Sequence, residues 1–230
     1  MISIITPILN ESKNIKPFLN HLNTLEGDFE LLFVDGGSTD NTISMVENNK
    51  KIFNKNLKLI KTSQGRGKQM NEGAKIAEGN ILLFLHVDCT LERDTIKVIE
   101  EVLKSIKIIG GGMIQAFSNP DFFLRFISKY GNFRVRINKV FFGDYGIFVK
   151  KDIFEKIGGY DDIIFLEDVE LCKKMKKYGE LIQINRKITT SPRRFQSLGK
   201  FRVTLMFITA LLINIVGIRP KFLIKYIVDK

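Results

Sequence analysis

The amino-acid sequence predicts an α/β fold built on a doubly wound, mostly parallel sheet with helices on both of its faces. Two observations predict it. Short apolar runs alternate with segments whose apolar residues recur every three or four positions, as strands followed by helices do. Three of the apolar runs also end in polar or acidic residues, and ligands of such sheets bind beyond the carboxyl ends of the strands. We therefore expect a binding site along that edge.

The first half of the chain supplies four strand and helix pairs. The strands are expected at residues 2–8, 30–35, 57–61 and 81–85. The helices are expected at residues 15–25, 43–46, 67–77 and 96–106. Asn14 is expected to cap the first helix, because an Asn side chain at that position accepts from a backbone N–H.

The second half is less regular. Glycine-rich stretches at 110–112 and 143–146 indicate loops or bulges. A strand is expected at 147–149 and a short helix at 152–157, with a further helix beginning at Glu167.

Composition bounds the class of protein. The chain has 230 residues, 44% of them hydrophobic, which is enough for one large domain or for one domain with a small appendage. A net charge of +11 fits nucleic acid, an anionic membrane surface or a phosphorylated substrate, and equally a well-solvated surface. Two widely separated cysteines give no disulfide framework or zinc pattern, so we expect a reducing compartment. No basic leader precedes the first strand, so a signal peptide is not expected and a cytoplasmic location is.

One long apolar stretch lies near the C-terminus. Residues 203–218 are nearly all apolar, which is shorter than the ~20 residues that span a bilayer. A buried core helix is one interpretation. A helix in a membrane interface is the second, since Lys200, Arg202, Lys221 and Lys225 lie nearby, and a transmembrane span is the least favoured.

Several familiar motifs are missing. No G-x-G-x-x-G follows the first strand, and the stretch from Gly65 to Lys68 lacks the Walker spacing and is followed by Gln69. A nucleotidyltransferase of related fold would normally carry a glycine-rich basic loop after the first strand, which is not present here. A nucleic-acid-binding protein is the alternative that the charge suggests, but the basic residues are scattered and no recognition motif is seen, so no nucleic acid is expected.

Polar residues at two strand ends are candidates for ligand binding. Asp35 could accept from the N–H of a nucleotide base, or it could form an Asx-turn that leads into Ser38. Asp88 is a hard oxygen donor of the kind that holds Mg²⁺ or Mn²⁺ together with substrate phosphates. His86 would share its face of an extended strand, where it could be a nitrogen ligand or a hydrogen-bonding residue without a metal.

Glu167 and Asp168 are adjacent carboxylates at the start of a helix. They could stabilise the helix dipole, or one of them could be a general base, because carboxyls in different surroundings divide such roles.

Taken together, these motifs resemble a known family. The segments that carry the resemblance are Thr6-Pro7-Ile8-Leu9-Asn10-Glu11, Val34-Asp35-Gly36-Gly37-Ser38-Thr39-Asp40-Asn41-Thr42, Leu85-His86-Val87-Asp88 and Glu167-Asp168-Val169-Glu170-Leu171. They are similar to family 2 glycosyltransferases of the GT-A fold, the nucleotide-diphospho-sugar transferase type. A small bacterial subgroup is the most similar, through Gly65–Ala74, Phe84–Asp88, Gly143–Phe148 and Ser191–Phe195.

The resemblance implies transfer of a sugar from a nucleoside diphosphate sugar to an acceptor hydroxyl. It places Asp168 as general base with Glu167 beside it, and Asp88, with His86 in the first position of the D-x-D motif, at a divalent metal, Mn or Mg. The implied donor-binding residues are Pro7, Asn10, Glu11, Asp35, Gly37, Arg66, Arg193 and Arg194. A single displacement would invert the anomeric centre.

The resemblance also implies a division of the chain. Residues 1–195 would form the transferase domain, with a nucleotide-sugar half at 1–110 and an acceptor and catalytic-base half at 111–195. Residues 196–230 would form a helical, membrane-associating segment. Aromatic residues of the second half could be core or could line an acceptor site, and core is favoured because large apolar residues are usually inside; they are Phe117, Phe122, Phe123, Phe126 and Phe133. We expect a lipid-linked acceptor and peripheral contact with the anionic inner face of the cell membrane through the basic C-terminal region.

Overall fold

The computed structural model describes residues 1–163, 165–205 and 209. The chain divides into two compact units, Met1–Thr190 and Ser191–Lys230. In the second unit, α8 spans Arg193–Leu198. The expected boundary at residue 195 and the two halves within the transferase domain stay predictions.

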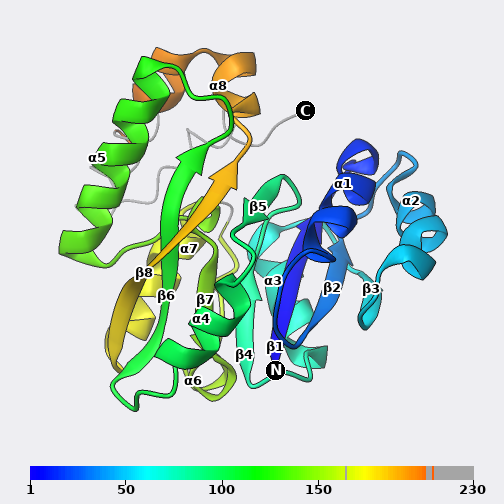
Figure 1. Cartoon of the computed structure of the whole chain (residues 1–230), viewed down its shortest axis with the longest axis horizontal. Coiled ribbons are helices and arrows are strands. Elements are labelled where there is room, and N and C mark those ends of the chain that lie inside the picture. Colours follow the sequence, from blue (N-terminus) through cyan, green and yellow to red (C-terminus); the bar gives the residue numbers. More distant parts are fainter. Residues whose placement is uncertain (164, 206–208, 210–230) are drawn as a thin grey trace. The chain divides into compact units, whose positions relative to one another are not determined.

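One mixed sheet organises the first unit (Figure 1). Its strands are β1 (Ile2–Ile8), β2 (Phe29–Asp35), β3 (Leu57–Lys61), β4 (Ile81–Phe84), β5 (Cys89–Leu91), β6 (Ile108–Phe117), β7 (Ile147–Lys150) and β8 (Glu180–Thr190). Their order is β3-β2-β1-β4-β7-β6-β8-β5. The strands β1 to β4 are mutually parallel, β7 is antiparallel to both β4 and β6, β8 is parallel to β6, and β5 is antiparallel to β8.

Helices cover both faces of this sheet. Those of the first unit are α1 (Ser12–Leu22), α2 (Thr42–Asn49), α3 (Arg66–Ile76), α4 (Thr95–Val102), α5 (Phe122–Asn138), α6 (Lys151–Lys156) and α7 (Glu167–Met175), with short 3₁₀ turns η1 (Lys50–Ile52) and η2 (Gly143–Tyr145). The alternation along β2 shows the two layers, because Leu31 and Phe33 belong to the core that contains α1 and α4. Leu32 and Val34 belong to the core that contains α3, α6 and α7. The expected α/β architecture is confirmed.

The predicted positions of strands, helices and bulges are mostly confirmed, and one predicted helix cap is wrong. The four predicted strand and helix pairs of the first half are present, but the first helix begins at Ser12 after Glu11, so Asn14 as its N-cap was wrong. The glycine run at 110–112 is not a loop, because strand β6 continues through it. The pairing of β6 with β8 shifts register on each side of the run, as expected for a bulge.

The aromatic residues of the second half are the clearest correction. Phe117 is buried, but Phe122, Phe126 and Phe133 are exposed on α5, so the core interpretation was wrong for these three. Their positions explain it, because α5 packs on β6 through its opposite face, where Leu124 is buried.

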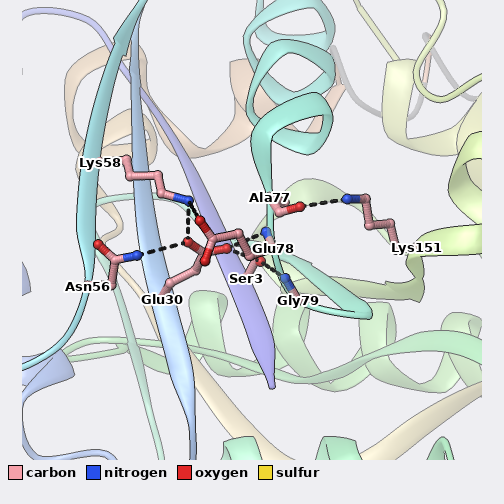
Figure 2. A network of polar contacts seen from close by, with 8 residues as sticks. All are labelled: Ser3, Glu30, Asn56, Lys58, Ala77, Glu78, Gly79 and Lys151. Atoms are coloured by element: carbon pink, nitrogen blue, oxygen red, sulfur yellow. Dashed lines mark hydrogen bonds and ion pairs between the residues drawn. The ribbon is translucent and has the colours of Figure 1, made fainter.

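A polar network ties the amino ends of the strands together (Figure 2). The carboxylate of Glu30 is 1% exposed, and it accepts from the Ser3 hydroxyl at 2.7 Å and the Glu78 N–H at 2.6 Å. Lys58 pairs with it at 3.0 Å. Burial alone would raise the pKa of Glu30, but these donors outweigh it and lower the pKa. The network therefore fixes the sheet at the end opposite to the predicted site.

Candidate active site

The carboxyl ends of β1 and β2 bring two predicted donor-binding segments side by side. Ile8 is in register with Asp35, so the chain leaves both strands at the same level of the sheet. Asn10 adopts a left-handed conformation with φ 54°, and its Oδ1 accepts from the Thr39 N–H at 2.8 Å. The Asn10 N–H in turn donates to Ser38 Oγ at 3.0 Å. The two loops are thus bonded into one surface.

Asp35 forms the Asx-turn that the sequence allowed. Its carboxylate accepts from the N–H groups of Gly37 at 3.0 Å and Ser38 at 3.1 Å, and also from the Ser38 hydroxyl. The side chain is buried, and the left-handed φ of 98° at Gly37 explains the glycine there. A role for Asp35 in recognising a nucleotide base stays a prediction. Pro7 is half-buried near the end of β1, and the Glu11 N–H donates to Thr42 Oγ1 at 2.7 Å.

Gln69 is a positioning residue that sequence reasoning missed. It is buried on α3, and its Nε2 donates both to the Ile8 carbonyl at 3.0 Å and to the Val34 carbonyl at 2.7 Å. One amide therefore fixes the helix to the ends of two strands. A glutamine inside a helix that otherwise packs small residues against a sheet was the available signal.

The start of α3 also reaches the second half of the chain. Arg66 Nη1 lies 3.5 Å from Glu167 Oε1. A Cβ at Gly67 would lie 2.9 Å from the Asp161 carbonyl, so only glycine permits this close approach. Asn71, which was also missed as a positioning residue, exchanges two hydrogen bonds of 2.9 Å with the backbone of Tyr160. Helix α3 and the segment before α7 are thus packed together.

Asp168 occupies the first turn of α7, two residues after Leu166, whose φ of 63° is left-handed. Its Oδ2 accepts from the Gly143 N–H at 2.7 Å and its Oδ1 from the Val169 N–H at 2.8 Å. Burial, and next the negative charge of Glu167, raise the pKa of Asp168 to about 7. Glu167 is 3% exposed. A carboxyl with a pKa near neutrality is suited to proton transfer.

His86 lies beside the same loop. A Cβ built on Gly143 would come within 2.7 Å of His86 Nε2, so the imidazole packs against the glycine whose N–H binds Asp168. The structure thus brings His86, Gly143 and Asp168 together. The sequence marked this stretch as a loop signal and as part of the family resemblance, but assigned no role to Gly143.

The local conformation of His86 and Asp88 differs from the expectation. Strand β4 ends at Phe84, and His86 and Asp88 lie in a turn that the Cys89 N–H closes by donating to the His86 carbonyl at 3.1 Å. The argument that both share one face of an extended strand was therefore wrong. Their common location now rests on the turn.

These two side chains can hold only part of a metal's coordination sphere. Within the part of the chain that the structure describes, no group of three or more His, Cys, Asp or Glu side chains is arranged to bind a metal. One carboxylate and one imidazole, both half-buried at the edge of the sheet, fit a cation that takes its other ligands from phosphates and water.

Helix α5 packs against the loop that contains Gly143. The guanidinium of Arg134 lies over the Phe142 ring, 4.4 Å from its centroid. Tyr145 is buried beside it, and that burial raises the pKa of its phenol. Arg134 Nη2 is buried and has no hydrogen-bond partner among the described residues.

The remaining predicted residues belong to the second unit. Arg193 and Arg194 open α8, so the structure does not place them relative to the site in the first unit. Most of the apolar stretch 203–218 lies outside the described residues. Among the residues that are described, no helix is long and apolar enough to cross a membrane.

Comparison with known sequences identifies the family. The model described as glycosyl transferase family 2 matches residues 3–158. A PGL/p-HBAD biosynthesis glycosyltransferase of Mycobacterium bovis is 43% identical over 103 residues, which cover 42% of this chain and 39% of that protein. The chain thus spans about two fifths of the length of this relative. Glycosyltransferase AglE of Haloferax volcanii is 23% identical over 250 aligned residues, covering 96% of this chain and 82% of that protein.

Solved structures agree on the fold. The mannosyltransferase PcManGT from Pyrobaculum calidifontis, in complex with GDP-Man and Mn²⁺, superposes with a TM-score of 0.68 at 21% identity, over 82% of this chain and 56% of that chain. S. aureus TarS 1-349 in complex with UDP-GlcNAc gives 0.63 at 20% identity, over 83% and 58%. The architecture, these likenesses and the family model together show that the chain belongs to glycosyl transferase family 2 and has the GT-A fold of its glycosyltransferases.

Proposed function

We propose that the protein transfers a sugar from a nucleoside diphosphate sugar to an acceptor hydroxyl with inversion at the anomeric carbon. The observation that carries this proposal is Asp168, a carboxyl with its pKa raised to about 7. It is held by the Gly143 N–H, against which His86 packs. The GT-A relatives PcManGT and TarS, crystallised with GDP-Man and UDP-GlcNAc, support a donor of this class.

The donor would lie on the surface formed by the ends of β1 and β2. Pro7, Asn10 and Glu11 approach from one strand end, and Asp35 and Gly37 from the other. Arg66 at the start of α3 would face the phosphates, and its pairing with Glu167 at 3.5 Å is loose enough to be exchanged for an anion. Arg193 and Arg194 would add positive charge to the leaving diphosphate.

Asp88 and His86 would hold a divalent metal, Mn²⁺ or Mg²⁺, which would offset the charge on the leaving diphosphate. PcManGT was crystallised with Mn²⁺, which supports the presence of such a cation.

The proton transfer follows from the geometry of Asp168. The Gly143 and Val169 N–H groups each occupy one lone pair of its carboxylate, which leaves others for the acceptor hydroxyl. Asp168 would take the hydroxyl proton as that oxygen bonds to the anomeric carbon and the bond to the diphosphate breaks. Each transfer releases one nucleoside diphosphate and leaves Asp168 protonated until solvent removes the proton.

The acceptor is proposed to be lipid-linked, with the protein at the cytoplasmic face of the cell membrane. The basic residues that flank the apolar stretch 203–218 support contact with an anionic surface.

Thermal unfolding with ligands tests the donor site. UDP-, GDP-, dTDP- and CDP-sugars would each be added with Mn²⁺, Mg²⁺ or a chelator. Ligand at ~100 times its dissociation constant stabilises a fold by about 2.7 kcal/mol, so one nucleotide family should raise Tm in a metal-dependent way. No rise with any of them would refute the proposal.

Asp168→Asn tests the role of the base, with Asp152→Asn on the exposed surface of α6 as the matched control. Release of nucleoside diphosphate in the presence of membrane lipid extract should fall about 10²- to 10⁴-fold for the first variant and stay unchanged for the second. Donor binding should survive in both, and equal activity would exclude Asp168 as base.

A further inference from the structure

Helix α5 has a row of apolar side chains on its outer surface. The exposed fractions are 88% for Phe122, 59% for Phe126, 59% for Tyr130, 62% for Phe133 and 69% for Ile137. At 100° per residue these five lie within an arc of about 80°, and they extend for about 22 Å along the helix. We call these five residues the α5 stripe. Surface apolar residues are ordinary when scattered, but a continuous row marks an interaction surface.

The orientation of α5 is fixed by its other face. Leu124, Ser128 and Val135 are buried against the sheet. Ser128 donates to the side chain of Gln115 at 2.8 Å, and Asn132 exchanges bonds of 2.9 and 2.8 Å with the Gln115 backbone on β6. Figure 1 shows α5 running beside β6. The helix cannot turn the α5 stripe inward without losing these bonds.

A row of cations borders the stripe. Arg125, Lys129 and Arg136 are exposed and lie within about 40° of one another around the helix, next to the edge of the stripe. The sequence of Phe122–Asn138 contains no acidic residue. An apolar face with aromatic residues and a cationic border is the pattern of helices that lie in the headgroup region of a membrane.

Charge decides among the possible occupants. A second copy of the chain would bring the same cations against themselves. An anionic bilayer is attracted to the cations and accepts the aromatic rings.

We propose that the α5 stripe is a membrane-docking surface, which inserts its rings at the level of the lipid headgroups while Arg125, Lys129 and Arg136 bind anionic lipid. This surface is independent of sugar transfer and distinct from the C-terminal region. The inner side of the same helix carries Arg134, which packs on the loop that holds Asp168. Docking would therefore bring the acceptor half of the site to the lipid surface.

A tryptophan reporter tests the insertion directly, because the chain has no tryptophan of its own. Phe126→Trp should show a blue-shifted emission with vesicles of phosphatidylglycerol and phosphatidylcholine, and quenching by brominated acyl chains. The control is Ile52→Trp, an exposed apolar site on η1, which should show neither. An unchanged Phe126→Trp spectrum on vesicles that bind the protein would overturn the proposal.

Flotation with the same vesicles measures the binding energy in the full chain. Phe126→Ser with Phe133→Ser should weaken partitioning at least tenfold, whereas the control pair Ile52→Ser with Ile76→Ser should leave it unchanged. Lys129→Gln with Arg136→Gln should weaken it about 25-fold at low salt, and Lys16→Gln with Lys51→Gln should have little effect.

Two other outcomes would also overturn the proposal. If Phe126→Ser with Phe133→Ser lowers Tm by several degrees, the stripe is covered by the chain itself. If the same variant turns a dimer into a monomer in solution, a second copy covers it. Donor-induced thermal shifts should be the same in all these variants, which separates failure of this surface from failure of the transferase proposal.

Discussion

Replacing the proposed catalytic base should make the fold more stable. In Asp168→Asn the carboxyl whose pKa is raised from 3.8 to about 7 becomes a neutral amide. The folded protein binds this proton more tightly than the unfolded chain does, so the stability of the natural protein falls as pH rises from about 4 to about 7. Below pH 4 the Asp168 carboxyl is protonated in both the folded and the unfolded protein, so it no longer destabilises the fold.

The size of the effect follows from the same shift. About three pKa units at 1.36 kcal/mol each set a ceiling of about 4 kcal/mol above pH 7. We take about half of that, because the amide can accept only one of the two N–H groups now bound. A gain of about 2 kcal/mol corresponds to a rise in Tm of about 4–8 °C for a chain of this size.

The assay is thermal unfolding at pH 8 and pH 4.5 of the natural protein, Asp168→Asn and the surface control Asp152→Asn. The free energy of unfolding of Asp152→Asn should stay within about 0.5 kcal/mol of that of the natural protein at both pH values. Asp168→Asn should be more stable at pH 8, and this advantage should disappear or reverse at pH 4.5, because the N–H group left unbound costs the same at both values. A variant that is no more stable at pH 8, or a gain that is the same at both pH values, would refute the reasoning.

Three further predictions concern other polar and close contacts of the fold. Glu30→Gln should destabilise the fold by about 1–3 kcal/mol at pH 7 and by less at acidic pH. A carboxylate with a lowered pKa loses its stabilising effect as it protonates, and urea unfolding at neutral and at acidic pH measures the difference. Gly143→Ala places a Cβ 2.7 Å from His86 Nε2, so we expect weaker Mn²⁺- or Mg²⁺-dependent donor stabilisation; a thermal shift equal to that of the natural protein would contradict it. Asn71→Ala removes two bonds to the Tyr160 backbone and should cost about 1–3 kcal/mol, which chemical denaturation at pH 7 would detect.

Periodicity alone predicted the first half of the fold, because buried parallel strands and amphipathic helices leave strong local patterns. Residue type alone misled on α5, where Phe122, Phe126 and Phe133 were assigned to the core because large apolar residues are usually inside, but they face outward. Which side of that helix meets the sheet is decided by Ser128 and Asn132 bonding to Gln115, and such contacts are not local in sequence.

The site shows the same division. Asp168, at a helix start, and His86, after a strand, were both predicted as site residues. That the loop at Gly143 contacts both of them was not predicted. The role of Gly143 depends on its N–H reaching Asp168, 25 residues away. No local sequence pattern encodes that contact. The glycine was the only signal, because a residue without a side chain permits another group to pack closely against the backbone.

The amide of Gln69 has a consequence for motion during turnover. Because it joins α3 to the carbonyls of both Ile8 and Val34, the backbone of that helix cannot shift without breaking these bonds or displacing β1 and β2. The nucleotide half of the cleft would then be preformed and stiff. Asn71 extends this stiffness to the segment before α7, because it exchanges two hydrogen bonds with the Tyr160 backbone. Release of product from the proposed site would accordingly not be timed by movement of α3.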